Sequence, residues 1–207
     1  MVTHYHTIDL RSFGVPPHKS ELIFEFLDPV WAWVRAAYRQ PASEMQWVPK
    51  RCYVREYPTH NYYGRGLQFG EAFAEATRTC SPGTYPMCVS LHWDGSNAHG
   101  LAATPICIGV ANTNSVSADT QYCIGYMPVL SDMGAKFNKT EIKYHIRNQC
   151  VAAILSVLET SARSGVRCRL PSLVEGEEDE RILMPRLFSM NLDQPEAQLY
   201  FGMLNRT

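Results

Sequence analysis

The sequence predicts a mixed α/β fold, and three observations support this prediction. Three short β-prone stretches follow one another at 85–93, 104–111 and 121–130, separated by turn residues. A helical apolar period then begins near residue 138. A fourth strand-like stretch follows at 182–193. Successive short strands joined by turns are typical of a β-meander, so we expect a sheet that begins with three antiparallel strands.

Composition excludes several classes of protein. The chain has 207 residues, of which 45% are hydrophobic and 19% charged, which predicts one folded domain with at most a short appendage and excludes global disorder. No run of about 20 apolar residues is present, so no membrane-spanning helix is expected. The formal net charge is −1, so any nucleic-acid contact must come from a local basic patch.

The N-terminal part predicts an extended lead-in followed by a helix. Residues 1–27 contain three histidines and two adjacent prolines, show little apolar periodicity and resemble no secretory signal. Asp28 is placed as a helix N-cap with Pro29 at the first helical position, and we expect the helix to end near Gln40 because Pro41 follows. Residues 28–83 are interpreted as a helical and irregular region, with a second short helix at 68–79.

After the meander, the sequence predicts a long helix. Asn138 and Glu141 form a capping box, and Gly165 is placed at the C-terminal end. We interpret 175–180 as an acidic surface loop and 182–193 as a strand in which Pro185 favours an edge or the first turn. A final helix is expected at 194–204. The helical apolar set is Ile142, Ile146, Cys150, Val151, Ile154, Leu155 and Leu158.

The predicted order of strand, strand, strand, helix, strand, helix is that of a ribonuclease-H-like mixed sheet, and we place this core at 84–207. Asp94 directly follows the first strand, and Asp193 ends the fourth. In such a sheet these two strands are parallel neighbours, so the two carboxylates could share Mg²⁺, which prefers hard oxygen ligands. Both aspartates also fit an ordinary structural role, as a turn residue and a helix cap.

The same stretches resemble a known family. Residues 86–97 (PMCVSLHWDGSN), 104–113 (TPICIGVANT) and 122–130 (YCIGYMPVL) are similar to core motifs of Plavaka-type transposases of the CACTA-like group. In that family a proline precedes a strand ending in Asp-x-Thr, a second proline precedes an Asn, and a third strand ends in Gly-Tyr-Leu-Pro. Residues 185–189 (PRLFS) and 193–198 (DQPEAQ) are similar to its later motif. The resemblance covers about residues 28–207.

The resemblance implies a DDE/D transposase catalytic core that cleaves and transfers DNA strands, with Asp94 and Asp193 as catalytic, metal-binding carboxylates for Mg²⁺ or Mn²⁺. It also implies DNA as partner and a nuclear location, and a homo-oligomer is an open alternative. Two features depart from the family pattern. Ser96 replaces the threonine of the first motif, and the third acidic residue is expected downstream of Thr207. We therefore expect a C-terminally incomplete core that does not cleave DNA by itself.

Two other functional classes stay open at this point. The chain could be a non-catalytic DNA- or protein-binding remnant of a transposase. It could also be an unrelated cytosolic α/β protein in which both aspartates are turn and cap residues. A downstream acidic residue in the reading frame would favour the enzyme over the remnant.

Two local basic patches are present despite the neutral total. The patch at 35–65 includes Lys50, Arg51, Arg55 and Arg65, interleaved with tyrosines and a tryptophan. It fits a nucleic-acid contact and a loop wrapping the core equally well. The patch at 136–169 fits a solvated helix face slightly better. We expect His92 and His145 to pack or hydrogen bond rather than to bind metal. The seven cysteines form no CxxC pair and indicate reduced thiols in an intracellular compartment.

Overall fold

The computed structural model describes residues 2–49, 70–93, 96–98, 101–113, 120–129 and 139–191. None of the helices described there has the length and hydropathy that a membrane crossing needs. The helices are α1 (Pro29–Tyr38), α2 (Glu71–Arg78) and α3 (Lys139–Ser164), with 3-10 turns η1 (Arg11–Phe13), η2 (Pro17–Lys19) and η3 (Ala42–Glu44). The strands are β1 (Thr3–Asp9), β2 (Glu21–Leu27), β3 (Tyr85–Trp93), β4 (Ser96–Ala98), β5 (Leu101–Ala103), β6 (Pro105–Val110), β7 (Gln121–Tyr126), β8 (Val166–Pro171) and β9 (Glu178–Asn191).

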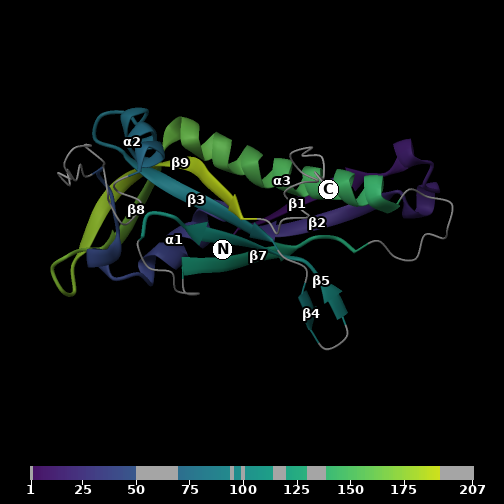
Figure 1. The fold of residues 1–207 in the computed structure, drawn as a ribbon, viewed down its shortest axis with the longest axis horizontal. Helices are drawn as coiled ribbons and strands as arrows, with labels where there is room; N and C mark the ends of the chain where they lie inside the picture. The colour runs from purple at the N-terminus through teal and green to yellow at the C-terminus, as the bar shows by residue number, and fades with distance from the viewer. Residues whose placement is uncertain are drawn as a thin grey trace, which may run out of the picture.

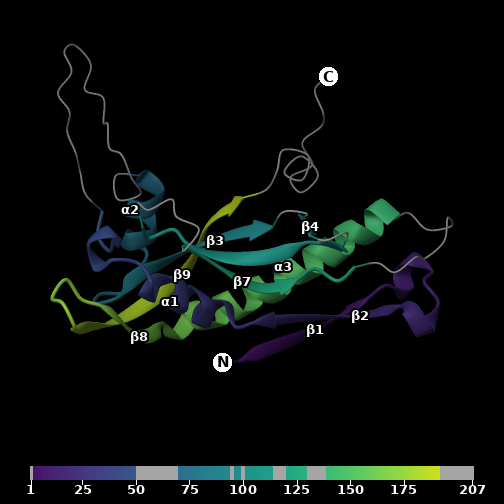
Figure 2. The same cartoon turned by 90° about the horizontal axis from the view of Figure 1, so that it is seen from below.

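These elements confirm the mixed α/β class. Seven strands form one curled sheet in the order β1-β2-β7-β6-β3-β9-β8, and β4 pairs with β5 in a separate small hairpin (Figure 1). Every pair in the large sheet is antiparallel except β3 with β9, which is parallel. The helix α3 runs the length of the sheet, from the β1–β2 end at its N-terminal side to β8 at its C-terminal side (Figure 2).

Several predicted elements are confirmed. The meander is β3, β6 and β7, paired in that order. The long helix is α3, and Gly165 follows it with φ 74°, a conformation that glycine adopts at helix ends. Asp28 caps α1 by accepting a 2.7 Å hydrogen bond from the Trp31 backbone N–H, and the helix at 68–79 is α2.

The N-terminal region predicted as an extended lead-in contains two paired strands. Residues 3–9 and 21–27 form the hairpin of β1 and β2 at one edge of the sheet, paired from Thr3 with Leu27 to Asp9 with Glu21. The signal was present in β2, whose buried Phe24 and Phe26 alternate with exposed Ile23 and Glu25. One exposed apolar residue in that alternation weakened the period in the sequence.

The acidic stretch is also more ordered than predicted. After Gly165 the chain forms β8, turns at 173–176 and returns as β9, so residues 178–180 are strand rather than surface loop. The β8–β9 ladder ends at the pair Val166 with Leu183. Pro185 lies beyond that pair, where β9 pairs with β3 but not with β8, although the strand order places β9 between these two strands rather than at the edge of the sheet.

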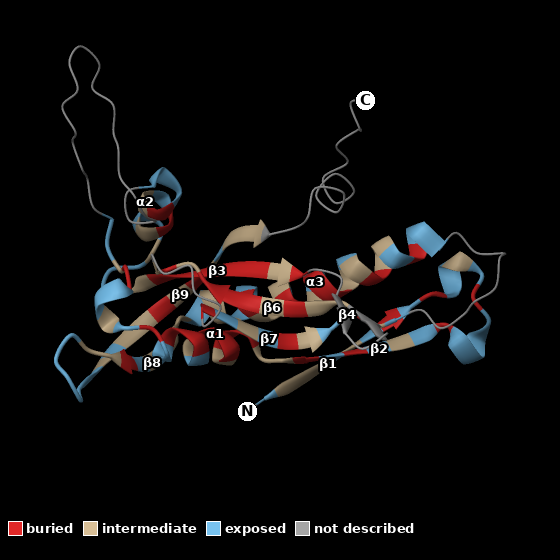
Figure 3. Cartoon of the chain, turned by 60° about the horizontal axis from the view of Figure 1, so that its bottom comes forward, coloured by how far each residue is buried: buried red, intermediate tan, exposed pale blue. Residues whose placement is uncertain are grey.

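The hydrophobic core lies on one face of the sheet, under α1 and α3 (Figure 3). Met87, Val89, Leu91 and Trp93 of β3 alternate into this core and are at most 2% exposed. Trp33 of α1 is fully buried, and its Nε1 donates a 2.9 Å hydrogen bond to the Cys88 carbonyl. This bond satisfies the one polar atom of a large core side chain and fixes α1 against β3.

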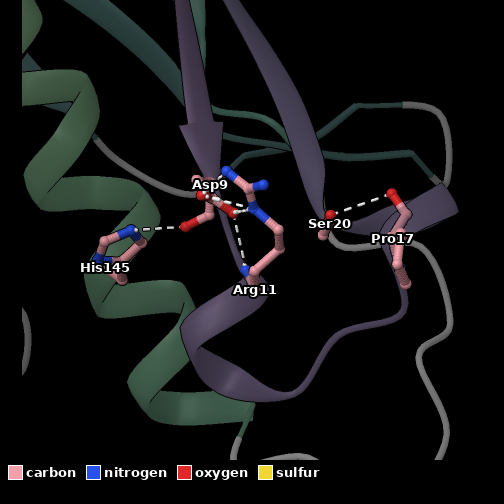
Figure 4. Close-up of polar contacts among 5 residues, drawn as sticks. All are labelled: Asp9, Arg11, Pro17, Ser20 and His145. Carbon is pink, nitrogen blue, oxygen red and sulfur yellow. Dashed lines mark hydrogen bonds and ion pairs between the residues drawn. The ribbon is translucent and has the colours of Figure 1, made fainter.

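Contacts near both ends join the β1–β2 hairpin to the rest of the molecule. Phe26 pairs with Gly125 of β7, where a Cβ would lie 2.7 Å from the Glu25 carbonyl oxygen, so only glycine allows this approach. At the other end, His145 of α3 donates a 3.1 Å hydrogen bond to the Asp9 carbonyl, as Figure 4 shows. The His145 ring also packs on Phe13 with centroids 5.1 Å apart, which confirms the packing and hydrogen-bonding role predicted for this histidine.

The turn after β1 is closed by side chains as well. The Arg11 guanidinium donates to both carboxylate oxygens of Asp9 at 2.6–2.9 Å, and Ser20 donates to the Pro17 carbonyl at 3.0 Å (Figure 4). The Arg11 hydrogen bonds lower the pKa of Asp9 to about 2. Both side chains are exposed, so this fork sets the shape of the turn more than the stability of the fold.

The buried side chain of Asn112 joins three segments. It is 0% exposed, and its Oδ1 accepts a 2.6 Å hydrogen bond from the Cys88 N–H. Its Nδ2 donates to the carbonyls of Pro86 (2.9 Å) and Gln46 (3.0 Å). The Gln46 N–H returns a 2.6 Å bond to the Asn112 carbonyl. The amide therefore connects the start of β3, the chain after β6 and the segment that follows α1.

Asn112→Ala should destabilise the protein by about 3 kcal/mol, because it leaves three buried backbone groups without partners. The measurement is urea denaturation followed by circular dichroism. Asn148→Ala on the exposed side of α3 is the matched control and should stay within about 0.5 kcal/mol of the wild type. Equal effects of the two variants would contradict the role given to Asn112.

Candidate functional site

The ends of β3 and β9 form the candidate site. The two strands pair in parallel from Tyr85 with Leu183 to His92 with Asn191, so both run toward the same edge of the sheet. Figure 2 shows the two arrowheads pointing the same way. Asp94 follows the last residue of β3 by one position, and Asp193 follows the last residue of β9 by two. The neighbouring parallel strands are as predicted, while both aspartates lie outside the described residues.

A β-bulge interrupts the parallel ladder before this edge. The register steps from Val89 with Leu187 to Ser90 with Ser189, which leaves Phe188 of β9 without an opposite residue. A bulge bends its strand and changes the direction of the side chains beyond it. The residue pairs at the C-terminal end of β9 therefore follow the shifted register. Sequence patterns do not reveal this shift.

A row of small polar side chains lies on the face of the sheet opposite the core. Ser90 and His92 of β3 share a hydrogen bond of 3.0 Å between Oγ and Nε2. His92 is directly opposite Cys107 of β6, and Cys107 is directly opposite Cys123 of β7. Burial lowers the pKa of His92, which favours its neutral imidazole. The row thus leads from the strand before Asp94 across two neighbouring strands.

Gly109 makes room for the Ser90–His92 pair. A Cβ at Gly109 would lie 2.2 Å from Ser90 Oγ and 3.1 Å from His92 Nε2. Ser90 is only 6% exposed, so its hydroxyl has little space to rotate away. The glycine is therefore required by the hydrogen-bonded pair on the adjacent strand.

The predicted basic contact residues also lie outside the described residues: Lys50, Arg51, Arg55 and Arg65. The second basic patch is described in most of its length, along α3 and β8. Arg163 pairs with Glu159 at 2.7 Å, and Arg167 pairs with Glu180 at 2.7 Å. These pairs involve exposed side chains, which fits the solvated-face interpretation of this patch.

An open acidic groove of about 620 Å³ lies at the other end of β9. Its lining includes Tyr38 at the end of α1, Arg169 of β8 and Glu178 of β9. The Tyr38 hydroxyl donates a 2.7 Å hydrogen bond to Glu178 Oε1. Since β9 begins at Glu178 and ends at Asn191, this groove is separated from the strand ends that precede the aspartates.

Three motif residues behind the family resemblance have structural roles in the described part of the chain. Pro86 supplies a carbonyl to the Asn112 amide, so the first two motifs are joined by a hydrogen bond. Gly125 of the third motif admits β2 beside β7. These positions thus have roles in the fold itself.

Within the described residues, no three side chains of His, Cys, Asp or Glu gather closely enough to hold a metal ion. Because Asp94 and Asp193 are outside those residues, the predicted Mg²⁺ or Mn²⁺ ligands stay a prediction. Cysteine and histidine, the side chains of the polar row, are in any case poorer ligands for these hard cations than carboxylates.

The pairing of Cys107 with Cys123 was not predicted. The sequence placed Cys107 in an apolar run, which suggested burial, but Cys107 is half-buried and Cys123 is exposed. Two cysteines on neighbouring strands face each other only in one register, and that register depends on a bulge between Ile106 and Cys107. The sequence contains no signal for this bulge.

Comparisons with known proteins give no relative: no family model, no curated protein and no solved structure matches this chain.

Gly109→Ala should destabilise the protein by about 1–3 kcal/mol, because the new methyl group displaces the Ser90 hydroxyl. Adding Ser90→Ala removes the nearest atom, so the double variant should be more stable than the sum of the two single effects predicts. The measurement is a double-mutant cycle of urea denaturation midpoints. Strictly additive effects would contradict the contact between these two positions.

Proposed function

We propose that this chain is a ribonuclease-H-like piece of a Plavaka-type DDE/D transposase, in which Asp94 and Asp193 bind Mg²⁺ or Mn²⁺ for phosphoryl transfer on DNA. The observation that carries the proposal is the parallel pairing of β3 with β9, the strands that come directly before these aspartates. If the strands were antiparallel, their C-terminal ends would lie at opposite edges of the sheet, and one ion could not contact both carboxylates.

The strand order supports the same proposal. The antiparallel meander β3, β6 and β7 is followed by the 26-residue α3 and then by β9, which lies beside β3. This is the order expected for the opening of a ribonuclease-H-like core. Two additions extend the sheet beyond that core: the hairpin of β1 and β2 on the β7 side, and β8 on the β9 side.

The chemistry proposed for the site follows from its ligands. Carboxylate oxygens suit Mg²⁺ and Mn²⁺, and a pair of such ions activates an attacking hydroxyl and stabilises the leaving oxygen in phosphoryl transfer. In this proposal Asp94 and Asp193 hold the ions at the ends of their strands. Metal binding tests these two carboxylates directly, because both are proposed as ligands.

We propose DNA as the partner of this chain and the nucleus as its location. A homo-oligomer is an additional possibility. The support is the basic and aromatic composition of the segment around Lys50, Arg51, Arg55 and Arg65. Cationic side chains neutralise phosphates, and interleaved aromatic rings stack on unpaired bases. The acidic groove lined by Glu178 and its neighbours would repel phosphates, so DNA is expected on the side of the strand ends instead.

Asp94→Asn and Asp193→Asn should each weaken Mn²⁺ binding by at least about tenfold, because each removes one charged oxygen ligand. The measurement is the fraction of free Mn²⁺ from its electron paramagnetic resonance signal during titration of the full chain. Mg²⁺ should compete for the same ion site.

Glu175→Gln, in the exposed turn between β8 and β9, is the matched control and should leave the Mn²⁺ affinity unchanged. The metal assignment fails if the wild type binds no Mn²⁺ at millimolar concentration. It also fails if both aspartate variants bind as tightly as the wild type.

Removing two positive charges with Arg51→Gln and Arg55→Gln should weaken binding to a short DNA duplex and lower the salt dependence by about 2 released ions. The measurement is fluorescence anisotropy of labelled duplex at several salt concentrations. Lys143→Gln with Arg163→Gln on α3 removes the same charge and should change the salt dependence less. Equal losses in both double variants would mean that binding follows total charge and that the Arg51 segment is no specific contact.

A further inference from the structure

Cys107 and Cys123 form a pair of thiols on the face of the sheet that the core helices leave uncovered. Cys107 of β6 is directly opposite Cys123 of β7 in the antiparallel ladder. Cys107 is half-buried and Cys123 is exposed, so small molecules can reach the pair. The two positions are sixteen residues apart in the sequence, and strand pairing rather than sequence proximity brings them together.

The backbone geometry fits a disulfide bond. Directly opposite residues of an antiparallel pair have Cα atoms about 4.5–5.5 Å apart, and disulfides form over about 4.4–6.8 Å. The two thiols lie close enough for each to shift the pKa of the other, and the Cys123 Sγ also donates a 3.6 Å hydrogen bond to the Gly125 carbonyl. The adjacent bulge, where the register shifts after Ile106, gives the strands room to adjust.

The two thiols differ in reactivity. The interaction with Cys107, and less so those with the Gly125 backbone and Tyr126, lowers the pKa of Cys123 to about 6, while the interaction with Cys123 raises the pKa of Cys107. Burial instead raises the pKa of Cys88 and of Cys150 to about 12. Since the thiolate is the nucleophile, Cys123 is the reactive member of the pair, and the buried cysteines are inert.

We propose that Cys107 and Cys123 form a redox-active dithiol that a peroxide oxidises to an intramolecular disulfide. The Cys123 thiolate attacks one peroxide oxygen, the O–O bond breaks, and hydroxide leaves and takes up a proton to become water. The Cys107 sulfur then attacks the Cys123 sulfenic acid, the S–S bond forms, and a second water leaves with the Cys107 proton. In sum, two thiols and one hydrogen peroxide give one disulfide and two waters.

Oxidation of this pair would link two neighbouring strands of the sheet, β6 and β7, covalently. Cys107 is opposite His92, two residues before Asp94, so the disulfide would fix β7 to the strand that lies beside β3. The proposal does not depend on the metal site. It rests on the two sulfur atoms and their strand register alone, so it can fail or succeed independently of the transposase proposal.

The test uses the full chain and hydrogen peroxide. After oxidation, free thiols are alkylated and the protein is cleaved before aspartates without reduction. Cleavage before Asp94, Asp119 and Asp132 places Cys107 in the peptide 94–118 and Cys123 in 119–131, apart from all other cysteines. The expected product is these two peptides joined, two hydrogens lighter than their sum, and separated by reduction.

The order of reaction is tested with single variants. Cys107→Ser should leave a Cys123 sulfenic acid that dimedone traps, whereas Cys123→Ser should leave Cys107 as a thiol. At pH 7 and without peroxide, Cys123 should be alkylated at least about tenfold faster than Cys150. Cys168→Ser, a half-buried cysteine of β8, is the matched control and should leave the joined peptides unchanged.

Three results would overturn the proposal. The first is recovery of both peptides unjoined and alkylated under peroxide. The second is Cys123 joined to any other cysteine of the same chain or of a second chain. The third is oxidation of Cys107 at the wild-type rate in Cys123→Ser. The peptide map of the wild type decides the first two even if a variant fails to fold.

Discussion

The hydrogen bonds of the buried Asn112 amide set the position of the strands on which the rest of the molecule is built. They fix the start of β3 through Cys88 and Pro86, and they hold the segment after α1 through Gln46. The Trp33 Nε1 donates to the Cys88 carbonyl, so the same strand residue is held by Asn112 and by α1. With β3 held in this way, β9 can pair along it in one register, and the two strand ends come together at one edge.

The two faces of β3 carry different side chains, one apolar and one polar. Met87, Leu91 and their neighbours on one face bury the core under α1 and α3. Ser90 and His92 on the other face begin a polar row that continues to the two cysteines. Because strand side chains alternate, the stability of the core and the reactivity of the outer face depend on the same register but on different residues.

Much of the fold could be predicted from local sequence patterns. The features that could not be predicted depend on pairing between residues far apart in the sequence. The capping residue Asp28, the helical period of α3 and the three β-prone stretches each act over a few residues, so the sequence shows them directly. The hairpin of β1 and β2 has weak alternation, and β8 is a short polar strand that exists because β9 pairs with it. The opposition of Cys107 and Cys123 needs the bulge, which no local pattern marks. Asp94 and Asp193 were placed by the order of strands, and the strands before them are indeed parallel neighbours.

The pairing of β3 with β9 also determines when the domain can fold. Tyr85 pairs with Leu183 and Phe26 with Gly125, each across about a hundred residues of chain. Such distant partners raise the contact order, which slows folding because a long loop must close before the contacts stabilise it. During synthesis, β1 and β2 are made long before their partner β7. In the same way, β3 is made long before β9. Until β9 has been made, the parallel partner of β3 is missing, and an unpaired strand edge of this kind favours aggregation.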